Sequence, residues 1–309
     1  MKVSIDMKSG KIAETSTKDI IAGIDLGTTH SLIAYIDNQG QPQTVKTGDG
    51  KQSLTPSIIH FDERGQLIVG EVAKQYLISQ PERTIFSVKR LMGKSYNDIS
   101  EFRSSLGYEI IDNDNDSLVK IKVDNQFYSP IELSAEILKS LKIDAEKALG
   151  TDITKAVITV PAYFNDAQRQ ATRDAGKLAG LDVLRIVNEP TAASLAYGIG
   201  IDRNQSMNIA VYDLGGGTFD ISILHIEDGI FEVLSTHGDT FLGGDDFDRA
   251  IVQYWTRILN LDDVKLQNDA TLGQSLRIAA EHAKKAVSSH NVYEGKVYDY
   301  LLKLDESTF

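Results

Sequence analysis

The feature that constrains this chain most is a short turn motif that occurs twice. Asp-Leu-Gly-Thr-Thr at 25–29 and Asp-Leu-Gly-Gly-Gly-Thr at 213–218 each follow one run of alternating apolar residues and precede another. Such alternation predicts β-strands, so each motif is expected to form the turn of a hairpin. Two copies of one hairpin in a single chain predict a duplicated α/β lobe.

The segments around the two motifs predict alternating helices and strands. Ser129-Pro130-Ile131-Glu132 has the signature of a capped helix start, and apolar residues then recur at helical spacing until Gly150. We expect two buried strands to follow, at 155–160 and 183–187, with a helix at 165–180 between them. Further strands are expected at 208–213, 219–226 and 230–235, and helices within 245–288.

These patterns divide the chain into a leader at 1–19, a first lobe at 20–204 and a second lobe at 205–309. The boundary is expected near the polar run at 202–205, because the strand pattern restarts after it. A chain of 309 residues is long enough for one large or two medium globular units.

Charge and composition exclude several classes of function. The chain has 32 basic and 44 acidic residues, a net charge of −12, which argues against nucleic-acid binding and a polybasic membrane contact. No apolar run reaches the roughly 18 residues of a membrane span, and the start lacks a signal-peptide pattern. The absence of cysteine excludes disulfides and thiolate metal sites. We therefore expect a cytoplasmic protein.

Both turns have the composition of a phosphate-binding loop. Gly27 lets the backbone approach a phosphate, and the hydroxyls of Thr28 and Thr29 can donate to its oxygens. Three glycines between two strands are unfavourable unless a ligand needs bare backbone. The pattern is not Walker A, which requires Gly-Lys-Ser/Thr before a helix. Facing hairpins would hold a triphosphate from both sides, the second through Gly215, Gly216 and Gly217.

The strands that lead into the two turns end in Asp25 and Asp213. Carboxylates there suit a magnesium ion held mostly through water, because magnesium keeps several of its waters. For the first turn taken alone, an ordinary hairpin with a glycine turn is the alternative. The six histidines show no spacing typical of a metal site.

With these motifs the chain resembles the actin-like ATPase superfamily, and within it the 70-kilodalton, DnaK-type heat-shock chaperones. The resemblance extends from about residue 21 to 288 and includes the segments at 87–93, 160–165, 188–193 and 241–248. It implies an actin-like α/β fold with duplicated ribonuclease H-like lobes. It also implies slow hydrolysis of ATP to ADP and phosphate with magnesium, and potassium ions beside the magnesium.

The resemblance implies roles for single residues. Lys89 would hold the attacking water and neutralise charge on the γ-phosphate, which Thr218 would contact. Position 285 departs from the family, whose cytosolic members typically have a stacking arginine there, so weaker adenine binding is expected. Magnesium and water would be ordered by Glu189, Asp213 and Asp220, and the adenosine would be bound by Glu281, Lys284, Lys285 and Ser288.

Each role has a structural alternative. Lys89 could be a solvated surface lysine, the carboxylates could cap strands, and a charged helix face is usually only a solvated one. His30 directly follows the threonine pair and is placed with the nucleotide-binding residues, although a neutral packed histidine is the alternative. Trp255 lies in an apolar helical pattern and is expected in the core.

Three further positions resemble those that pass signals in this family. Pro161 and Arg169 match a proline switch and its relay arginine, and Arg185 matches an arginine that docks J-domain co-chaperones. A proline that only ends a strand and an arginine in a local ion pair are the alternatives.

Details before the first strand and at 22–25, 87–93 and 242–246 resemble the HscA-type chaperone of iron–sulfur cluster assembly, whose scaffold protein would be the client. The alternatives are a general DnaK-type chaperone, a sugar or acid kinase of the same fold, a fragment that binds nucleotide without turnover, and a filament-forming actin relative. The resemblance further implies that the second lobe is truncated and that the peptide-binding part is absent.

Overall fold

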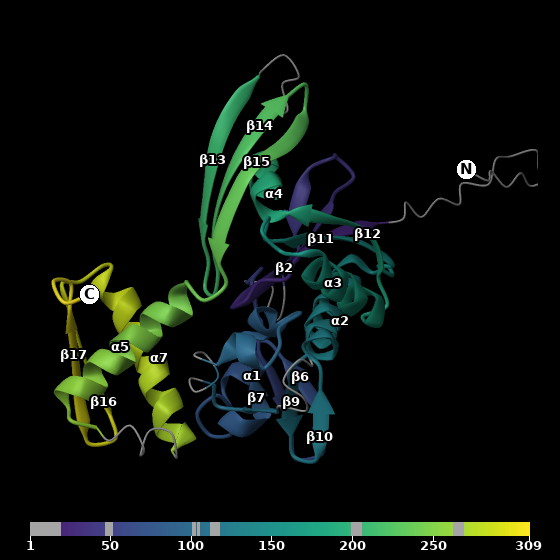
Figure 1. Ribbon diagram of the computed structural model, residues 1–309. Helices are drawn as coiled ribbons and strands as arrows, with labels where there is room; N and C mark the ends of the chain where they lie inside the picture. The colour runs from purple at the N-terminus through teal and green to yellow at the C-terminus, as the bar shows by residue number, and fades with distance from the viewer. Residues whose placement is uncertain are drawn as a thin grey trace, which may run out of the picture.

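The computed structural model describes residues 20–46, 52–100, 103, 106–111, 118–198, 206–261 and 269–309. The leader and the polar run at 202–205 lie outside the described residues. Figure 1 shows a first lobe of sheet and helices, a long strand meander, and a pair of helices with a C-terminal hairpin.

The first lobe is built on a six-stranded sheet with the order β12-β11-β1-β2-β3, in which β4 also pairs with β2. β1 is parallel to β11 and β11 to β12, whereas β1, β2 and β3 are antiparallel neighbours. Ile24 of β1 lies between Ile158 and Ile33 in register, and all three are buried in one core. The strands are β1 (Ile21–Asp25), β2 (His30–Ile36), β3 (Pro42–Thr44), β4 (Thr55–Pro56), β11 (Lys155–Val160) and β12 (Asp182–Asn188).

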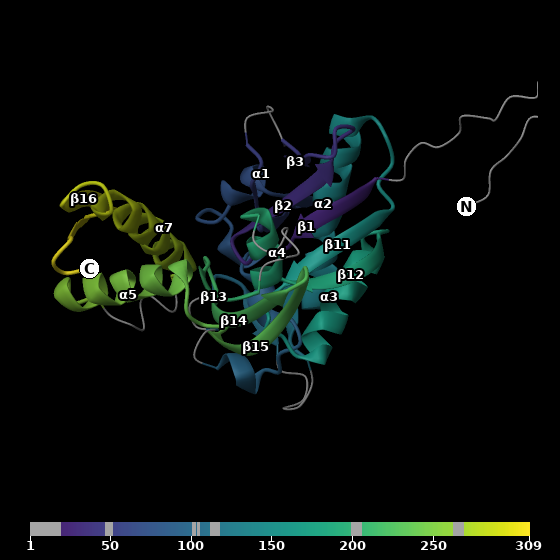
Figure 2. The ribbon, with the colours of Figure 1, turned by 90° about the horizontal axis from the view of Figure 1, so that it is seen from above.

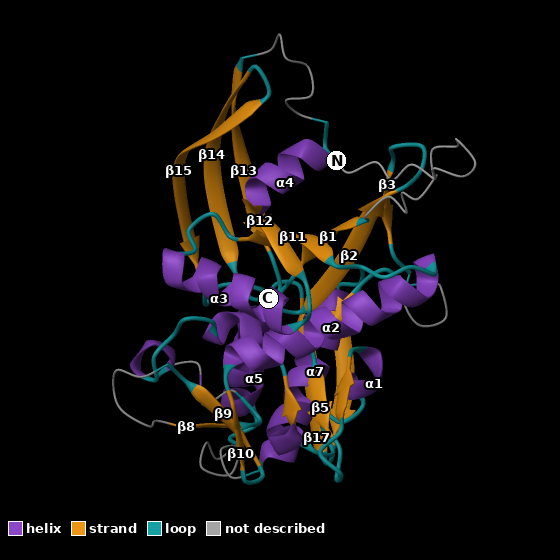
Figure 3. Cartoon of the chain, turned by 90° about the vertical axis from the view of Figure 1, so that its right-hand side faces the viewer, coloured by secondary structure: helices purple, strands orange, loops and turns teal. Residues whose placement is uncertain are grey.

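Two helices cover one side of this sheet, α2 (Pro130–Leu149) and α3 (Asp166–Leu178), and α4 (Glu189–Ala196) lies on the other side (Figure 3). As predicted, Ser129 and Asn165 cap α2 and α3 with reciprocal capping boxes. Gly150 follows α2 with φ 65°, a left-handed conformation that glycine adopts without steric cost. The sequence therefore predicted these helices and their ends.

Small strands and short helices between β4 and α2 form the part of the lobe that the sequence did not predict. They give two three-stranded sheets, with the orders β6-β5-β7 and β10-β9-β8. The elements are β5 (Ile59–Phe61), β6 (Leu67–Val69), α1 (Glu71–Lys74), η1 (Pro81–Arg83), β7 (Thr84–Ile85), η2 (Val88–Leu91), η3 (Asn97–Ile99), β8 (Glu109–Ile111), β9 (Lys120–Val123) and β10 (Gln126–Tyr128).

The second half contains an antiparallel meander of β13 (Met207–Leu214), β14 (Phe219–Glu227) and β15 (Ile230–Asp239). A separate core lies between α5 (Gly244–Ile258), α7 (Ala270–Val287), β16 (Val292–Val297) and β17 (Tyr300–Asp305). Seen from above in Figure 2, α5 and α7 lie beside the first lobe. Trp255 is fully buried in this core and donates to the Lys303 carbonyl, which confirms the prediction.

The duplication in the structure involves a smaller part of each half than the sequence predicted. Among the described residues, what repeats is an antiparallel meander with the Asp-Leu-Gly turn after its first strand, β1-β2-β3 in one half and β13-β14-β15 in the other. Parallel strands extend the first meander, and within the described ranges they do not extend the second. The strand predicted at 183–187 is confirmed as β12, but it is less buried than expected, because Val183 alone of these residues is buried. In the described part of the chain, no helix is long and apolar enough to cross a bilayer.

Replacing buried Leu138 of α2 by alanine is expected to lower the free energy of unfolding of the first lobe by about 2–5 kcal/mol, because it leaves a cavity between helix and sheet. Ile143 lies on the same helix but is 47% exposed, so Ile143→Ala should cost at most about 1 kcal/mol. Urea unfolding followed by circular dichroism measures both. Equal losses would contradict the packing described here.

Candidate functional site

A cavity of about 690 Å³ lies where the two repeated turns meet, a volume typical of small-molecule sites. Its wall is formed by the β1–β2 and β13–β14 turns, by α1 and η2 of the first lobe, and by the starts of α4 and α5 and one face of α7. The predicted site residues in this wall are Asp25, Gly27, Thr28, Thr29, His30, Lys89, Glu189, Asp213, Gly215, Gly216, Thr218, Glu281, Lys284 and Lys285.

The two turns pack directly on each other at the base of the cavity. A β-carbon on Gly216 would lie 1.8 Å from the Thr29 hydroxyl oxygen, and one on Gly217 would lie 2.2 Å from the Thr28 methyl carbon. Contacts this short leave no room for any side chain. Gly216 and Gly217 therefore let the second turn pack against the threonine side chains of the first, whereas the sequence analysis assigned the glycines to close approach of a phosphate.

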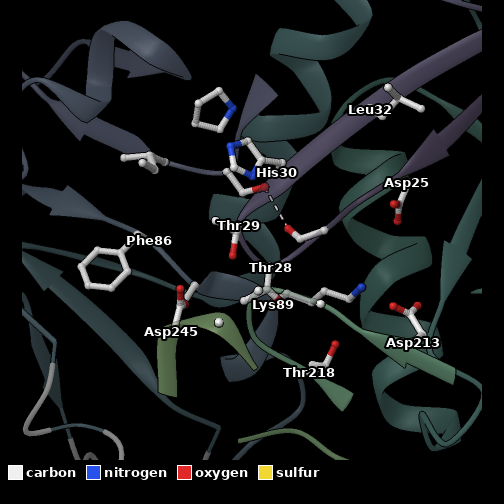
Figure 4. A pocket seen from close by; sticks show the side chains of 18 of the residues that line it. Asp25, Thr28, Thr29, His30, Leu32, Phe86, Lys89, Asp213, Thr218 and Asp245 are labelled. Carbon is white, nitrogen blue, oxygen red and sulfur yellow. Dashed lines mark hydrogen bonds between the residues drawn. The ribbon is translucent and has the colours of Figure 1, made fainter. Parts of the chain in front are cut away.

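The threonine hydroxyls fit an anionic ligand. Thr28 Oγ1 and Thr29 Oγ1 are buried and, among the described residues, have no hydrogen-bond partner. A buried hydroxyl without a partner costs free energy, so such atoms usually bind a ligand or water. Both residues belong to the cavity wall (Figure 4). A phosphate group placed between the turns would satisfy both hydroxyls.

Lys89 and Glu189 form a buried ion pair, with Lys89 Nζ 2.7 Å from Glu189 Oε1. Lys89 is 8% exposed, so it is not the solvated surface lysine that was the alternative. Burial alone would lower the pKa of Lys89, but Glu189, Asp25 and Asp213 outweigh it and the pKa is raised. Burial, partly offset by Lys89, raises the pKa of Glu189 to about 7. Lys89 therefore stays charged at neutral pH.

Asp25 and Asp213 flank this ion pair. Figure 4 shows the Lys89 ammonium directed toward both carboxylates, which come from the ends of β1 and β13. Asp25 Oδ1 accepts a hydrogen bond from Thr159 Oγ1 at 3.0 Å, and burial raises the pKa of Asp213. Such an acidic pair suits a divalent cation. No cluster of three metal-ligating side chains occurs in the described ranges.

The adenosine residues predicted on α7 are only partly brought to the cavity. Glu281 and Lys285 line it and pair with each other one turn apart. Lys284 also lines it, but its ammonium donates to the Gly244 carbonyl and pairs with buried Asp248, so it ties α7 to α5. Ser288 lies outside the cavity wall, and its hydroxyl donates to the Lys284 carbonyl. Three of the four residues predicted on this helical face therefore line the cavity, and Ser288 does not.

His30 lines the cavity near the charged side chains of α1 and α7. It is exposed rather than packed, which contradicts the alternative of a packed histidine. Partial burial and then the charge of Lys74 lower the pKa of His30. The imidazole is therefore neutral at pH 7 and able to contact a ligand.

Asp220 and Gly217 do not form part of the cavity wall, contrary to prediction. The Asp220 carboxylate accepts hydrogen bonds from the Ala162 amide and from the hydroxyls of Ser222 and Thr236. These bonds engage its carboxylate outside the cavity wall, opposite Asp213 in the β13–β14 register, so its predicted part in ordering magnesium and water stays a prediction. Gly217 instead accepts a hydrogen bond from Arg90 through its carbonyl oxygen.

Pro161 and Arg169 are brought together, as predicted. The Arg169 guanidinium donates to the carbonyls of Phe164 and Ala162 at 2.9 Å and of Pro161 at 3.5 Å. Because Asp220 accepts from the Ala162 amide, the turn after β11 is connected to β14 of the second half. Arg185 lies exposed on β12, and the ion pairs of the described residues do not include it. The docking role and the local ion pair both stay predictions.

Four residues at this site received no role from the sequence. Ser87 and Arg90 flank Lys89 and contact Asp245 and Asp246 at the start of α5. The available signal was their place in the segments 87–93 and 241–248, which carried the family resemblance. Their contacts join segments more than 150 residues apart, so the sequence alone could not pair them.

Comparison with known proteins decides the family. The sequence pattern of the Hsp70 protein family matches residues 21–298. This chain belongs to the Hsp70 family. It is also 51% identical over 272 residues to the chaperone protein dnaK of Thalassiosira pseudonana, a match that covers 87% of this chain and 44% of that protein. The expected heat-shock family and its actin-like α/β fold class are confirmed, whereas the HscA-type branch is not shown.

The Hsp70 chain spans less than half the length of this relative. The match therefore concerns the part that contains the two turns and the cavity between them.

Gly216→Ala is expected to lower the affinity for magnesium ATP at least about tenfold, because its methyl group would force the turns apart at Thr29. Gly23→Ala is the matched control, since its methyl group would have its nearest neighbour, the Ala34 carbonyl oxygen, at 4.0 Å. Isothermal titration with each folded variant gives the dissociation constants. An unchanged affinity of Gly216→Ala would contradict the close contact of the turns.

Proposed function

We propose that this chain binds magnesium ATP between its two repeated turns and hydrolyses it slowly, as the nucleotide-driven part of a general DnaK-type chaperone. The observation that carries the proposal is the buried Lys89–Glu189 pair, which lies beside Asp25 and Asp213 where the turns meet. The family assignment supports it, because Hsp70 proteins are ATPases.

Different residues of the cavity would bind the phosphates, act on the attacking water and hold the magnesium ion. Backbone amides of the two turns and the hydroxyls of Thr28 and Thr29 bind the phosphates, and Thr218 donates to the terminal phosphate. The Lys89 ammonium positions the attacking water and compensates the charge that builds on the phosphoryl oxygens. When bound, magnesium supplies further positive charge at those oxygens. Asp25, Asp213 and Glu189 are the groups that would hold it, mostly through its waters.

The nucleoside would lie between α7 and the first lobe. Glu281 and Lys285 offer a carboxylate and an ammonium to the ribose and adenine, and the neutral His30 ring lies on the opposite wall. Because Lys285 lacks the planar guanidinium of arginine, its stacking on adenine is weaker. Slow release of ADP is therefore not expected to depend on Lys285 alone.

Nucleotide state would pass to the rest of a chaperone through the turn after β11. Arg169 holds the Pro161 and Ala162 carbonyls while Asp220 of β14 accepts from the Ala162 amide, so movement of β14 changes this turn. Arg185 offers an exposed cation on β12 to the acidic or polar surface of a J-domain co-chaperone. These roles follow the family resemblance and agree with the geometry.

The narrower predictions stay predictions. The likeness to the HscA type rested on the leader, which lies outside the described residues, and on the segments 22–25, 87–93 and 242–246. The iron–sulfur scaffold as client has no support among the described contacts. A potassium ion, the cytoplasmic location and the truncation of the second lobe likewise stay predictions. A sugar kinase would need a carboxylate base beside a second small-substrate space, and Asp25 and Glu189 are both engaged with Lys89 or Thr159.

Lys89→Ala is expected to abolish single-turnover hydrolysis of magnesium ATP, a fall of at least about 100-fold, while ADP binding remains, because the ammonium acts on the reacting phosphate. Lys139→Ala on α2 removes an equally charged side chain far from the cavity and should leave the rate unchanged. Quenched-flow assays with labelled ATP measure both. Unchanged hydrolysis by Lys89→Ala would overturn the mechanism.

The affinity for magnesium ADP is expected to rise about tenfold from pH 6 to pH 8 and to level off above the pKa of Glu189, about 7. The raised pKa keeps Glu189 largely protonated at pH 6, and only its ionised form attracts the ion. Glu189→Gln should flatten this dependence, and the difference between the two titrations removes the pH effect of the nucleotide itself. Parallel pH profiles for both proteins would refute the assignment.

A further inference from the structure

Arg90 is the residue next to Lys89, and it crosses from the first lobe to the second. Its side chain is fully buried, and its Nε donates to the Gly217 carbonyl at 2.7 Å. The other two guanidinium nitrogens bind the Asp246 carboxylate, one of them at 3.3 Å. Arg90 thus contacts both the second phosphate turn and the first turn of α5.

The start of α5 is itself docked on that phosphate turn. The Gly244 amide donates to the Gly215 carbonyl at 3.0 Å, and the Asp245 amide donates to the Gly216 carbonyl at 2.7 Å. These bonds make the turn and the first residues of α5 one unit. The guanidinium of Arg90 adds a third connection, and this connection reaches the first lobe.

A second contact fixes the other end of the η2 turn. Ser87 Oγ donates to Asp245 Oδ2 at 2.7 Å, and Ser87 has φ 55°, a left-handed conformation that is unfavourable for serine. Strain of this kind persists only where surrounding contacts hold it. The η2 turn is therefore held to α5 on both sides of Lys89.

Lys89 and Arg90 point to different partners from this single short turn. Lys89 reaches Glu189 in the cavity, while Arg90 reaches Gly217 and Asp246. Because consecutive residues of a 3₁₀ turn share one backbone, displacement of Arg90 also displaces the Lys89 ammonium. An error of about 1 Å in such a group can cost about 100-fold in rate.

We propose that Arg90 is a positioning residue, which makes closure of the second phosphate turn and placement of the Lys89 ammonium a single event. The inference rests on the proposed ATPase function. A neutral or flexible side chain could not replace it, because the planar guanidinium serves the Gly217 carbonyl and the Asp246 carboxylate in one rigid geometry. The nucleotide would thus be attacked only when both turns are in place.

Arg90→Lys tests the proposal, with Arg83→Lys as the matched control. Arg83 makes a similar fork-like contact with Asp124, but within the first lobe and at the surface. In Arg90→Lys we expect the single-turnover rate of ATP hydrolysis to fall about tenfold or more, while the dissociation constant for magnesium ADP changes less than about threefold. Arg83→Lys should change neither.

Two outcomes would overturn the inference. If Arg90→Lys hydrolyses ATP like Arg83→Lys, the guanidinium does not position Lys89. If the rate and the ADP affinity fall by the same factor, Arg90 only holds the lobes together.

Hydrogen exchange measured without nucleotide separates this inference from the proposed function. Arg90→Lys is expected to raise amide exchange in 88–93 and 215–218 together, whereas Arg83→Lys leaves both protected. Exchange that rises in only one of the two segments would refute their coupling. This readout stands even if the unmodified chain proves unable to hydrolyse ATP, an outcome that would refute the proposed function.

A double variant covers the case in which Arg90→Lys fails to fold. Replacing a buried ion pair by apolar residues of similar size often restores stability, whereas removal of one partner leaves a buried charge. Arg90→Met with Asp246→Leu is therefore expected to unfold at a higher temperature than Arg90→Met alone, yet to hydrolyse ATP about tenfold more slowly than the unmodified chain. Recovery of the rate together with stability would show a purely structural role.

Discussion

The direct contact between the two glycine turns is the constraint on which the rest of this structure depends. Gly216 and Gly217 lie against Thr29 and Thr28 so closely that a single methyl group would separate them. This contact turns two separate hairpins into one cradle with buried hydroxyls and, beside it, two carboxylates. The position of the lysine turn, the docking of α5 and the shape of the cavity all follow from keeping the two backbones in contact.

Two ion pairs balance the charge at this cradle, one in the cavity and one behind it. In the cavity, Lys89 pairs with Glu189 and lies near Asp25 and Asp213, so the uncompensated charge is negative and suits a cation. Behind it, Arg90 pairs with Asp246 away from water. A buried pair of this kind contributes little net stability, but loss of Arg90 would leave the buried Asp246 carboxylate with Arg249, at 3.3 Å, in place of the Arg90 guanidinium. The Arg90–Asp246 pair behind the cavity therefore orders the Lys89–Glu189 pair within it.

The described contacts also connect the second meander to the end of β11. β14 carries Asp220, whose carboxylate holds the Ala162 amide, and Arg169 holds the carbonyls on either side of that amide. Asp220 was expected to help order magnesium and water, and its hydrogen bonds make it a connector between the second meander and the end of β11. The same residue type at the end of a motif can serve chemistry or structure, and only its neighbours decide which.

The sequence by itself determined the local elements and the chemistry of the two turns. Capping residues determined the starts of α2 and α3, the alternation at 208–226 determined a hairpin, and the Asp-Leu-Gly repeats determined two glycine turns, because each signal acts within a few residues. Tertiary structure decided which side chains meet: it withdrew Asp220, Gly217 and Ser288 from the cavity and brought Arg90 to Asp246. Such pairings depend on packing between segments far apart in the chain, where no local rule specifies the partner.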